Sequence, residues 1–149
     1  MKLRIFLVPV ACCWFSACAS HSLTSAEQGA LKLRYATAGE AYKNGELSTA
    51  ETHYLALVRN DPEFAEGWFR LGNIYVRTGQ LDAAVNMYEK ALKLNPEDGK
   101  VWNNLALARV KQAVAALDEG AINVGQESGE RVAMTTLRKR IVDATLTRR

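Results

Sequence analysis

Cysteine, proline and histidine are scarce in this sequence, and each shortage excludes a class of structure. The 149 residues include three cysteines, none of them after position 18, so the rest of the chain has no disulfide framework. Three prolines are too few for a turn-rich β-protein and leave long stretches free to form helices. Two histidines, with no cluster of cysteines or acids at ligand spacing, do not supply a zinc site.

A strong charge of one sign is also lacking. The formal net charge is +3. Residues 131–149 hold six basic residues against one acidic residue, whereas residues 18–130 hold 11 basic and 15 acidic residues. The chain therefore has a mildly acidic body and a basic C-terminal end, which can steer a charged partner but does not specify one.

The chain opens with a pattern typical of a secretory signal peptide. Lys2 and Arg4 precede an uncharged apolar run over 5–15, and small residues follow it. The run is shorter than the ~20 apolar residues that a membrane-spanning helix needs. We therefore predict that residues 1–17 are a cleaved signal peptide rather than an anchor.

Cys18 closes this segment. The sequence FSAC at 15–18 resembles the lipobox of bacterial lipoproteins, although the family usually has leucine in place of Phe15. The resemblance implies that Cys18 carries a lipid anchor and that residues 18–24 are a tether. Ala19, where inner-membrane lipoproteins often have aspartate, favours the periplasmic face of the outer membrane. The alternative is ordinary signal-peptide cleavage, which would release a soluble periplasmic protein.

A 34-residue period governs the middle of the sequence. Five pairs of identical residues have this spacing: Gly45 and Gly79, Leu47 and Leu81, Ala50 and Ala84, Tyr54 and Tyr88, and Pro62 and Pro96. A fixed period of this length is the signature of stacked helical hairpins, in which each unit buries its apolar face against its neighbour.

Residues 65–98 resemble one complete tetratricopeptide repeat (TPR). The signature positions of the family's two helices fall on Trp68, Leu71, Gly72 and Tyr75, and on Ala84, Tyr88, Ala91 and Pro96. Independently of the family, Trp68, Leu71 and Tyr75 share one face of a helix, and Gly79 suits a turn that needs a positive φ. The resemblance implies an all-α fold of antiparallel helix hairpins stacked into a superhelix.

The repeats on either side are less complete. Residues 31–64 have a good second helix but lack the tryptophan and leucine of the first, as expected for an end repeat. The period 99–117 begins with the first-helix pattern but has no turn signal where a second helix should start. We predict a TPR domain over 25–117, with about two full repeats and a partial third, beginning near Ser25 in a capping box formed with Thr24.

Residues 118–149 form the predicted C-terminal part. Gly120, Gly125 and Gly129 break the preceding pattern, and we interpret this stretch as a linker. A final amphipathic helix is predicted over 130–148, with an apolar stripe of Ala133, Leu137, Ile141 and Ala144. We expect this helix to cap the open end of the superhelix.

No set of residues predicts catalysis. His21 and His53 stand alone, no nucleophile is paired with a base, and the glycines fit neither a dinucleotide-binding nor a P-loop spacing. We therefore predict no enzyme activity, no cofactor and no metal. Export also argues against a nucleic-acid partner for the basic C-terminal end.

The TPR resemblance implies a concave groove lined by the first helix of each repeat. The family's lining positions give the residues that we predict to contact a protein partner: Tyr35, Tyr42, Lys43, Phe69, Asn73, Val76, Arg77, Asn103 and Leu107, with Gly39 and Val110 beside them. Asn73 and Arg77, one turn apart, can hold a peptide backbone or a carboxylate. The carboxylate-clamp pattern of some TPR chaperone adaptors is not reproduced, because its Lys/Asn pair is missing from the first repeat.

These features predict a lipid-anchored TPR scaffold that binds a protein partner in the bacterial envelope. By analogy with small TPR lipoproteins, we expect an assembly or localisation factor for a pilus or secretion machine. Two alternatives stay open. One is an adaptor that regulates a cell-wall enzyme, and the other is a self-assembling structural subunit, because three repeats are near the minimum for stability and a homodimer would compensate.

Overall fold

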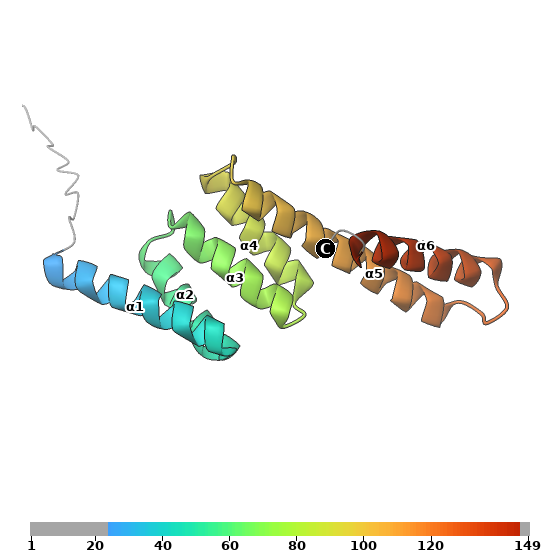
Figure 1. The fold of residues 1–149 in the computed structure, drawn as a ribbon, viewed down its shortest axis with the longest axis horizontal. Coiled ribbons are helices and arrows are strands. Elements are labelled where there is room, and N and C mark those ends of the chain that lie inside the picture. The colour runs from blue at the N-terminus through green and yellow to red at the C-terminus, as the bar shows by residue number, and fades with distance from the viewer. Residues whose placement is uncertain (1–23, 147–149) are drawn as a thin grey trace, which may run out of the picture.

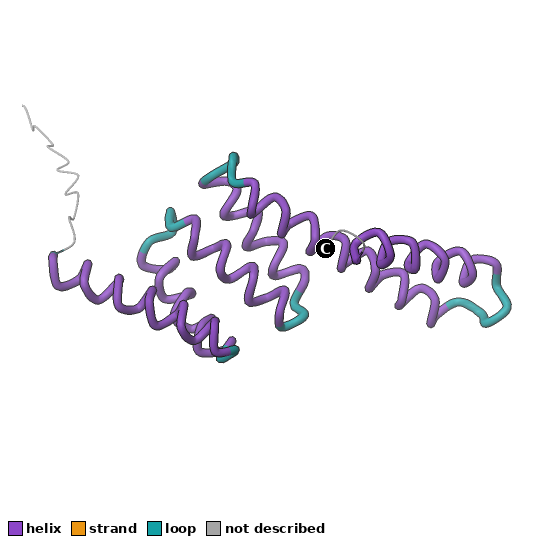
Figure 2. Tube along the Cα trace, in the orientation of Figure 1, coloured by secondary structure: helices purple, strands orange, loops and turns teal. Residues whose placement is uncertain are grey.

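The computed structural model describes residues 24–146, which form six helices joined by short turns (Figures 1 and 2). The helices are α1 (Ser25–Asn44), α2 (Leu47–Asn60), α3 (Ala65–Arg77), α4 (Leu81–Leu94), α5 (Gly99–Asn123) and α6 (Gly129–Leu146). Residues 24–146 contain no strand, and none of their helices is long and apolar enough to cross a membrane. The all-α prediction is confirmed, whereas the predicted signal peptide and Cys18 lie outside the described residues.

The ends of the helices follow local signals in the sequence. Helix α1 begins at the predicted capping box, in which the Glu27 N–H donates to Thr24 Oγ1 (3.3 Å) and the Thr24 N–H donates to Glu27 Oε2 (2.7 Å). Gly45 ends α1 with a φ of 81°, and Gly79 follows α3 with a φ of 78°. Both glycines adopt the left-handed conformation that reverses the chain into a hairpin, as predicted for Gly79.

The two hairpins, α1–α2 and α3–α4, stack with the predicted period. Trp68 Nε1 donates to the Pro62 carbonyl and Trp102 Nε1 donates to the Pro96 carbonyl, both at 2.8 Å. Each tryptophan therefore fixes the loop that leads from one hairpin into the first helix of the next. Figure 1 shows the resulting array, in which α2 packs against α3 and α4 packs against α5.

A close approach of α4 to α3 depends on Gly72. A Cβ atom at this position would lie 2.4 Å from Cε1 of Tyr88, well inside van der Waals contact. The ring of Tyr88 therefore rests against the backbone of α3 and is 1% exposed. This contact positions the hydroxyl of Tyr88 beside the polar side chains of the groove described below.

The predicted end of the third repeat at residue 117 is wrong. Helix α5 continues through Gly120 to Asn123, and the linker comprises only residues 124–128. Glycine inside a helix costs roughly 1 kcal/mol relative to alanine, which is why the sequence favoured a break. Here the missing side chain makes room for Met134, whose Sδ lies 2.9 Å from where a Cβ of Gly120 would be. Packing against α6 compensates for the weak helix propensity.

Helix α6 does not cap the open end of the superhelix as expected. It runs back along the C-terminal half of α5, beyond the stacked hairpins (Figure 1). Trp102, at the open end, remains 53% exposed. The continuous α5 is the reason, because it carries α6 past the end of α4.

The face of α6 that meets α5 also differs from the prediction. Of the predicted stripe, Ala133, Leu137 and Ala144 are exposed and only Ile141 is half-buried. Met134, two turns before Ile141 on the same side of the helix, packs on Gly120, so α5 covers only this edge of the stripe. The apolar stripe seen in the sequence is therefore real, but most of it faces solvent.

Candidate protein-binding groove

The first helices of the repeats border two adjoining hollows. The first hollow lies between α1 and α3 and has a volume of about 280 Å³. Buried Tyr54 of α2 contributes to its lining. Among the described residues, its lining consists of Tyr35, Ala36, Gly39, Glu40, Tyr42, Lys43, Tyr54 and Arg70.

The second hollow, of about 190 Å³, spans α1, α3, α4 and α5. Its lining consists of Tyr42, Asn73, Val76, Arg77, Tyr88, Asn104, Leu107 and Lys111. Tyr42 lines both hollows, so the two adjoin, and together they border the three first helices α1, α3 and α5. We call the two hollows together the groove.

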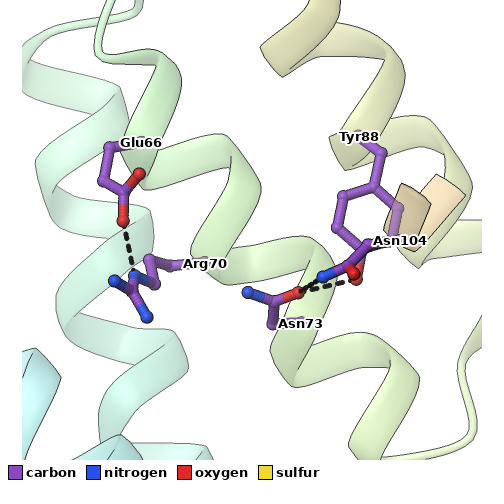
Figure 3. A network of polar contacts seen from close by, with 5 residues as sticks. All are labelled: Glu66, Arg70, Asn73, Tyr88 and Asn104. Atoms are coloured by element: carbon purple, nitrogen blue, oxygen red, sulfur yellow. Dashed lines mark hydrogen bonds and ion pairs between the residues drawn. The ribbon is translucent and has the colours of Figure 1, made fainter. Parts of the chain in front are cut away.

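Asn73 occupies the centre of a hydrogen-bond network in the groove (Figure 3). Its Oδ1 accepts hydrogen bonds from the Tyr88 hydroxyl and from Asn104 Nδ2, both at 2.8 Å. Because two donors meet this oxygen, the amide orientation is fixed and Nδ2 points away from both. Nδ2 has no acceptor within the described part of the chain, so it is available to bind a carbonyl of a partner.

The ionisation state of Tyr88 supports this orientation. Burial raises the pKa of Tyr88 to about 12, so the hydroxyl stays protonated at any physiological pH. A protonated hydroxyl is able to donate, and in this structure it donates to Asn73 Oδ1. The network thus presents the amide nitrogen of Asn73, rather than its oxygen, to the groove.

Arg77 joins α3 to the end of α1. Its Nη1 donates to the Tyr42 carbonyl (3.0 Å), and its guanidinium lies 4.7 Å from the centroid of the Tyr42 ring. The Tyr42 carbonyl belongs to the last turn of α1 and also accepts from the Gly45 N–H at 3.2 Å, so Arg77 is its second donor. Arg77 therefore has a structural role in addition to lining the groove, and its remaining N–H groups are available to a ligand.

The groove is basic, although residues 18–130 carry a net negative charge. Lys43 pairs with Glu40 at 2.8 Å, and Arg70 pairs with Glu66 at 2.6 Å (Figure 3). These pairs are partly exposed and contribute little to stability. Arg77 and Lys111 have no ion pair among residues 24–146, so the second hollow retains an uncompensated positive charge.

The structure brings together seven of the nine predicted contact residues. Tyr35, Tyr42 and Lys43 line the first hollow, and Asn73, Val76, Arg77 and Leu107 line the second together with Tyr42. Their contact with a partner stays a prediction.

Phe69 and Asn103 do not lie in the groove. The ring of Phe69 packs 6.1 Å from that of Tyr88, on the hydrophobic cluster between α4 and α5, and borders a separate hollow beside Ala65 and Asn95. Asn103 is exposed, and its side chain contacts only Asn104 within the described residues. Neither side chain reaches the space that the other seven share.

Sequence reasoning missed Arg70, Asn104 and Lys111. Asn104, Leu107 and Lys111 are spaced at i, i+3 and i+7, which places them on one stripe of α5. That stripe was a signal available in the sequence, because Leu107 was already assigned to the groove. Asn103 is one residue earlier and therefore points about 100° away from Asn104.

A third and larger hollow lies outside the groove, at the N-terminal end of the array. Its volume is about 480 Å³, and it is mostly apolar, with Leu31 and Tyr35 of α1 facing Leu57 and Phe64. The ring of Tyr35 meets that of Phe64 edge-on at 5.7 Å. Tyr35 lines this hollow as well as the groove.

The described residues contain no group of three or more His, Cys, Asp or Glu side chains placed to hold a metal ion. His53, considered in the sequence, is half-buried on α2. The side chains that line the groove are amides, cations, tyrosines and aliphatic groups. Such a set can bind a polypeptide through hydrogen bonds, charge and apolar contact.

Comparisons with known proteins give one family. Residues 35–85 match a family model described as "Tetratricopeptide repeat", and residues 72–112 match one described as "TPR repeat". The chain is 34% identical over 95 residues to the "Tetratricopeptide repeat-containing protein trd-1" of Caenorhabditis elegans, a match that covers 58% of the chain and 12% of that protein.

Two proteins of Schizosaccharomyces pombe are also similar. The "Heat shock protein sti1 homolog" is 32% identical over 72 residues, which is 48% of the chain, and the "TPR repeat-containing protein C19B12.01" is 36% identical over 70 residues, which is 47% of the chain. The matches span 12% and 9% of those proteins. All three relatives are much longer eukaryotic proteins, so the similarity concerns the repeats.

Proposed function

Residues 35–112 carry tetratricopeptide repeats, and from this premise we propose that the chain is a scaffold whose groove binds an extended segment of a protein partner. The observation that carries the proposal is the orientation of Asn73. Its oxygen is held by Tyr88 and Asn104, and its nitrogen faces the groove without an acceptor among the described residues. A fixed amide donor at the centre of a groove suits recognition of a peptide backbone.

The side chains around Asn73 define the segment that fits. Val76 and Leu107 offer apolar contact, and Leu107 is 46% exposed, so a partner can bury it. Arg77 and Lys111 favour an acidic side chain or a terminal carboxylate. We therefore propose a segment that combines an apolar residue with a neighbouring negative charge.

Charge reversal of Lys111 tests the groove. Lys111 makes no hydrogen bond or ion pair among the described residues, so Lys111→Glu should leave the helix content unchanged while weakening partner binding. The matched control is Lys93→Glu, which reverses an exposed lysine on α4, outside both hollows. The partner is first identified with a photo-crosslinking residue at position 107 in cells, and its affinity for each variant is then measured by calorimetry.

Binding should fall about tenfold for Lys111→Glu and stay unchanged for Lys93→Glu. Equal affinity of both variants for the partner would rule out the groove. Arg77 is a poorer choice for this test, because its substitution also releases the end of α1 from α3.

We further propose that the chain acts in the bacterial envelope, anchored by lipid on Cys18, as an assembly or localisation factor for a pilus or secretion machine. The support is the order of charged, apolar and small residues before Cys18 and the resemblance of 15–18 to a lipobox. Binding, rather than catalysis, is the activity that this role requires.

Replacing Cys18 tests the anchor. Cys18→Ser should move the chain from the membrane fraction to the soluble periplasmic fraction, because the thioether that holds the acyl chains cannot form. Cys13→Ser is the matched control, since it changes a cysteine inside the same segment and should leave the fractionation as it is. Membrane association that survives Cys18→Ser would remove the lipid anchor from the proposal.

A further inference from the structure

The α5–α6 hairpin lacks a core of its own. Ala108 is the last residue of the described chain that is fully buried, so neither the C-terminal half of α5 nor the described part of α6 contains a buried side chain. Helix α6 packs against α5 and extends beyond the repeats (Figures 1 and 2). A single helix hairpin cannot bury its apolar face alone, so this one requires a further layer.

One side of α6 carries an exposed apolar stripe that such a layer could cover. Ala133, Leu137 and Ala144 are spaced at i, i+4 and i+11, which places them on one stripe, and all three are exposed. Leu137 is 46% exposed. Ile141 borders the same stripe and is half-buried. The stripe extends over about three turns of the helix.

A stripe of small residues on α5 lies beside it. Ala113, Ala116 and Gly120 are spaced at i, i+3 and i+7, and both alanines are exposed. Met134 bridges the two stripes, because its sulfur approaches Gly120 and it lies one turn from Leu137. The two stripes therefore border the same seam, with small side chains on α5 and one large side chain, Leu137, between the two alanines on α6.

The charges of the hairpin identify its partner. Residues 113–128 hold three acidic residues and no basic residue, whereas α6 holds four basic residues and two acidic ones. Within one copy Arg138 of α6 already pairs with Asp118 of α5. A second copy of the same hairpin, turned over, sets the other basic residues of α6 against Glu119 and Glu127 of its partner. A surface that is complementary to itself in charge and shape is the property of a two-fold interface.

We propose that two copies of this chain dimerise through the α5–α6 hairpin, forming an antiparallel four-helix bundle. The small, exposed side chains of Ala113 and Ala116 let α6 of the partner copy approach closely, whereas Gly120 is covered by Met134 of its own copy. Leu137 and Ile141 of each copy then enter the seam of the other. The bundle supplies the second layer that the isolated hairpin lacks.

The test uses the full chain, purified in a mild detergent, and measures its molar mass by light scattering over roughly 1–100 µM. Leu137→Asp places a charge in the seam of both copies and should raise the dissociation constant of the dimer about a hundredfold. Val132→Asp is the matched control. Val132 is 63% exposed on the same helix but lies about 140° around it from Leu137, so this variant should dimerise like the unaltered chain.

A monomeric unaltered chain at the highest concentration overturns the proposal, and so does a dimer that persists in Leu137→Asp or is lost equally in Val132→Asp. A second readout avoids any effect of aspartate on the fold. A photo-crosslinking residue at position 137, but not at position 132, should give a species of twice the chain's mass. The test leaves every groove residue intact, so its outcome is independent of the groove proposal.

Discussion

At the scale of the residue, Asn73 shows how a core contact prepares a surface group. Gly72 lets Tyr88 approach α3, and Tyr88 then holds the oxygen of the neighbouring Asn73. The same two positions thus serve the packing of α4 and the chemistry of the groove. A substitution that disturbs the packing of Tyr88 on α3 should therefore also change the position of the Asn73 side chain in the groove.

Substitution of Gly72 by alanine tests this dependence. The new Cβ would overlap the Tyr88 ring, so we expect the free energy of unfolding to fall by about 1–3 kcal/mol, as for other overpacked cores. Gly29→Ala is the control, since a Cβ at Gly29 meets nothing within 4 Å and should stabilise α1 by roughly 0.5–1 kcal/mol. Urea unfolding followed by circular dichroism measures both. A stable Gly72→Ala variant would contradict the close approach.

The buried tyrosines predict a loss of stability in alkali. Burial raises the pKa of Tyr54, Tyr75 and Tyr88 to about 12, against about 10 in the unfolded chain. From about pH 10 to about pH 12 the folded chain binds more protons than the unfolded chain. The contribution of these tyrosines to stability is therefore fully present below about pH 10. The free energy of unfolding should decrease as the pH rises from about 10 to about 12.

Urea midpoints measured on either side of about pH 10 check this dependence. Tyr88→Phe should show a smaller decrease than the unaltered chain, because one ionisable group is removed from the buried set. The comparison between the two chains cancels the titration of surface lysines. An identical decrease in both would mean that Tyr88 ionises as freely in the folded chain as in the unfolded one.

The groove shows what a sequence register can and cannot locate. Leu107 stands one period after Asn73, and the family pattern placed it correctly beside the second hollow. Asn103 was assigned by the same pattern, yet Asn104 reaches Asn73. A period fixes which helix faces the groove, whereas the hydrogen bond depends on where each side chain points, and neighbouring positions differ by about 100°.

At the scale of the element, α5 is the least expected part of the fold. It serves as the first helix of a third repeat and also as half of a separate hairpin. Gly120 reads as a break, since glycine is a weak helix former, but contact with Met134 decides the outcome. The apolar stripe of α6 was visible in the sequence. Such a stripe predicts that one face of the helix is buried, but it does not identify the element that buries it.

The continuity of α5 can be tested with proline. Ala115→Pro removes a hydrogen bond inside the helix and should cost about 3 kcal/mol or more, so amides in 118–146 should lose protection from hydrogen exchange while those in 65–98 keep it. Gln126→Pro is the control, because Gln126 is the second residue of a turn closed by the Ser128 N–H and the Gly125 carbonyl (3.0 Å), where proline is favoured. Unchanged protection in Ala115→Pro would indicate a break in α5.

At the scale of the whole molecule, stability should be graded along the array. Contacts join consecutive helices, and one hydrophobic cluster lies between the two hairpins and another between α4 and α5. Helices α3 and α4 touch both clusters, whereas α6 touches neither. In such an array each unit depends mainly on its neighbours.

Hydrogen exchange of the Leu137→Asp variant measures this gradient without the proposed dimer. We expect the slowest exchange in α3 and α4 and the fastest in α6, which has no buried side chain in its described part. In the unaltered chain, protection of α6 should rise with protein concentration. Strong protection of α6 in the variant, equal to that of α4, would contradict the gradient.

The unbroken α5 has one further consequence. It carries Asn104 in the groove and Gly120 in the hairpin, separated by roughly 24 Å of helix axis at about 1.5 Å per residue. If two chains dimerise through their α5–α6 hairpins, the two continuous α5 helices would hold the two grooves at a fixed distance from each other. A bivalent target whose two binding segments match that distance would gain avidity from the fixed spacing of the grooves alone, without any additional contact.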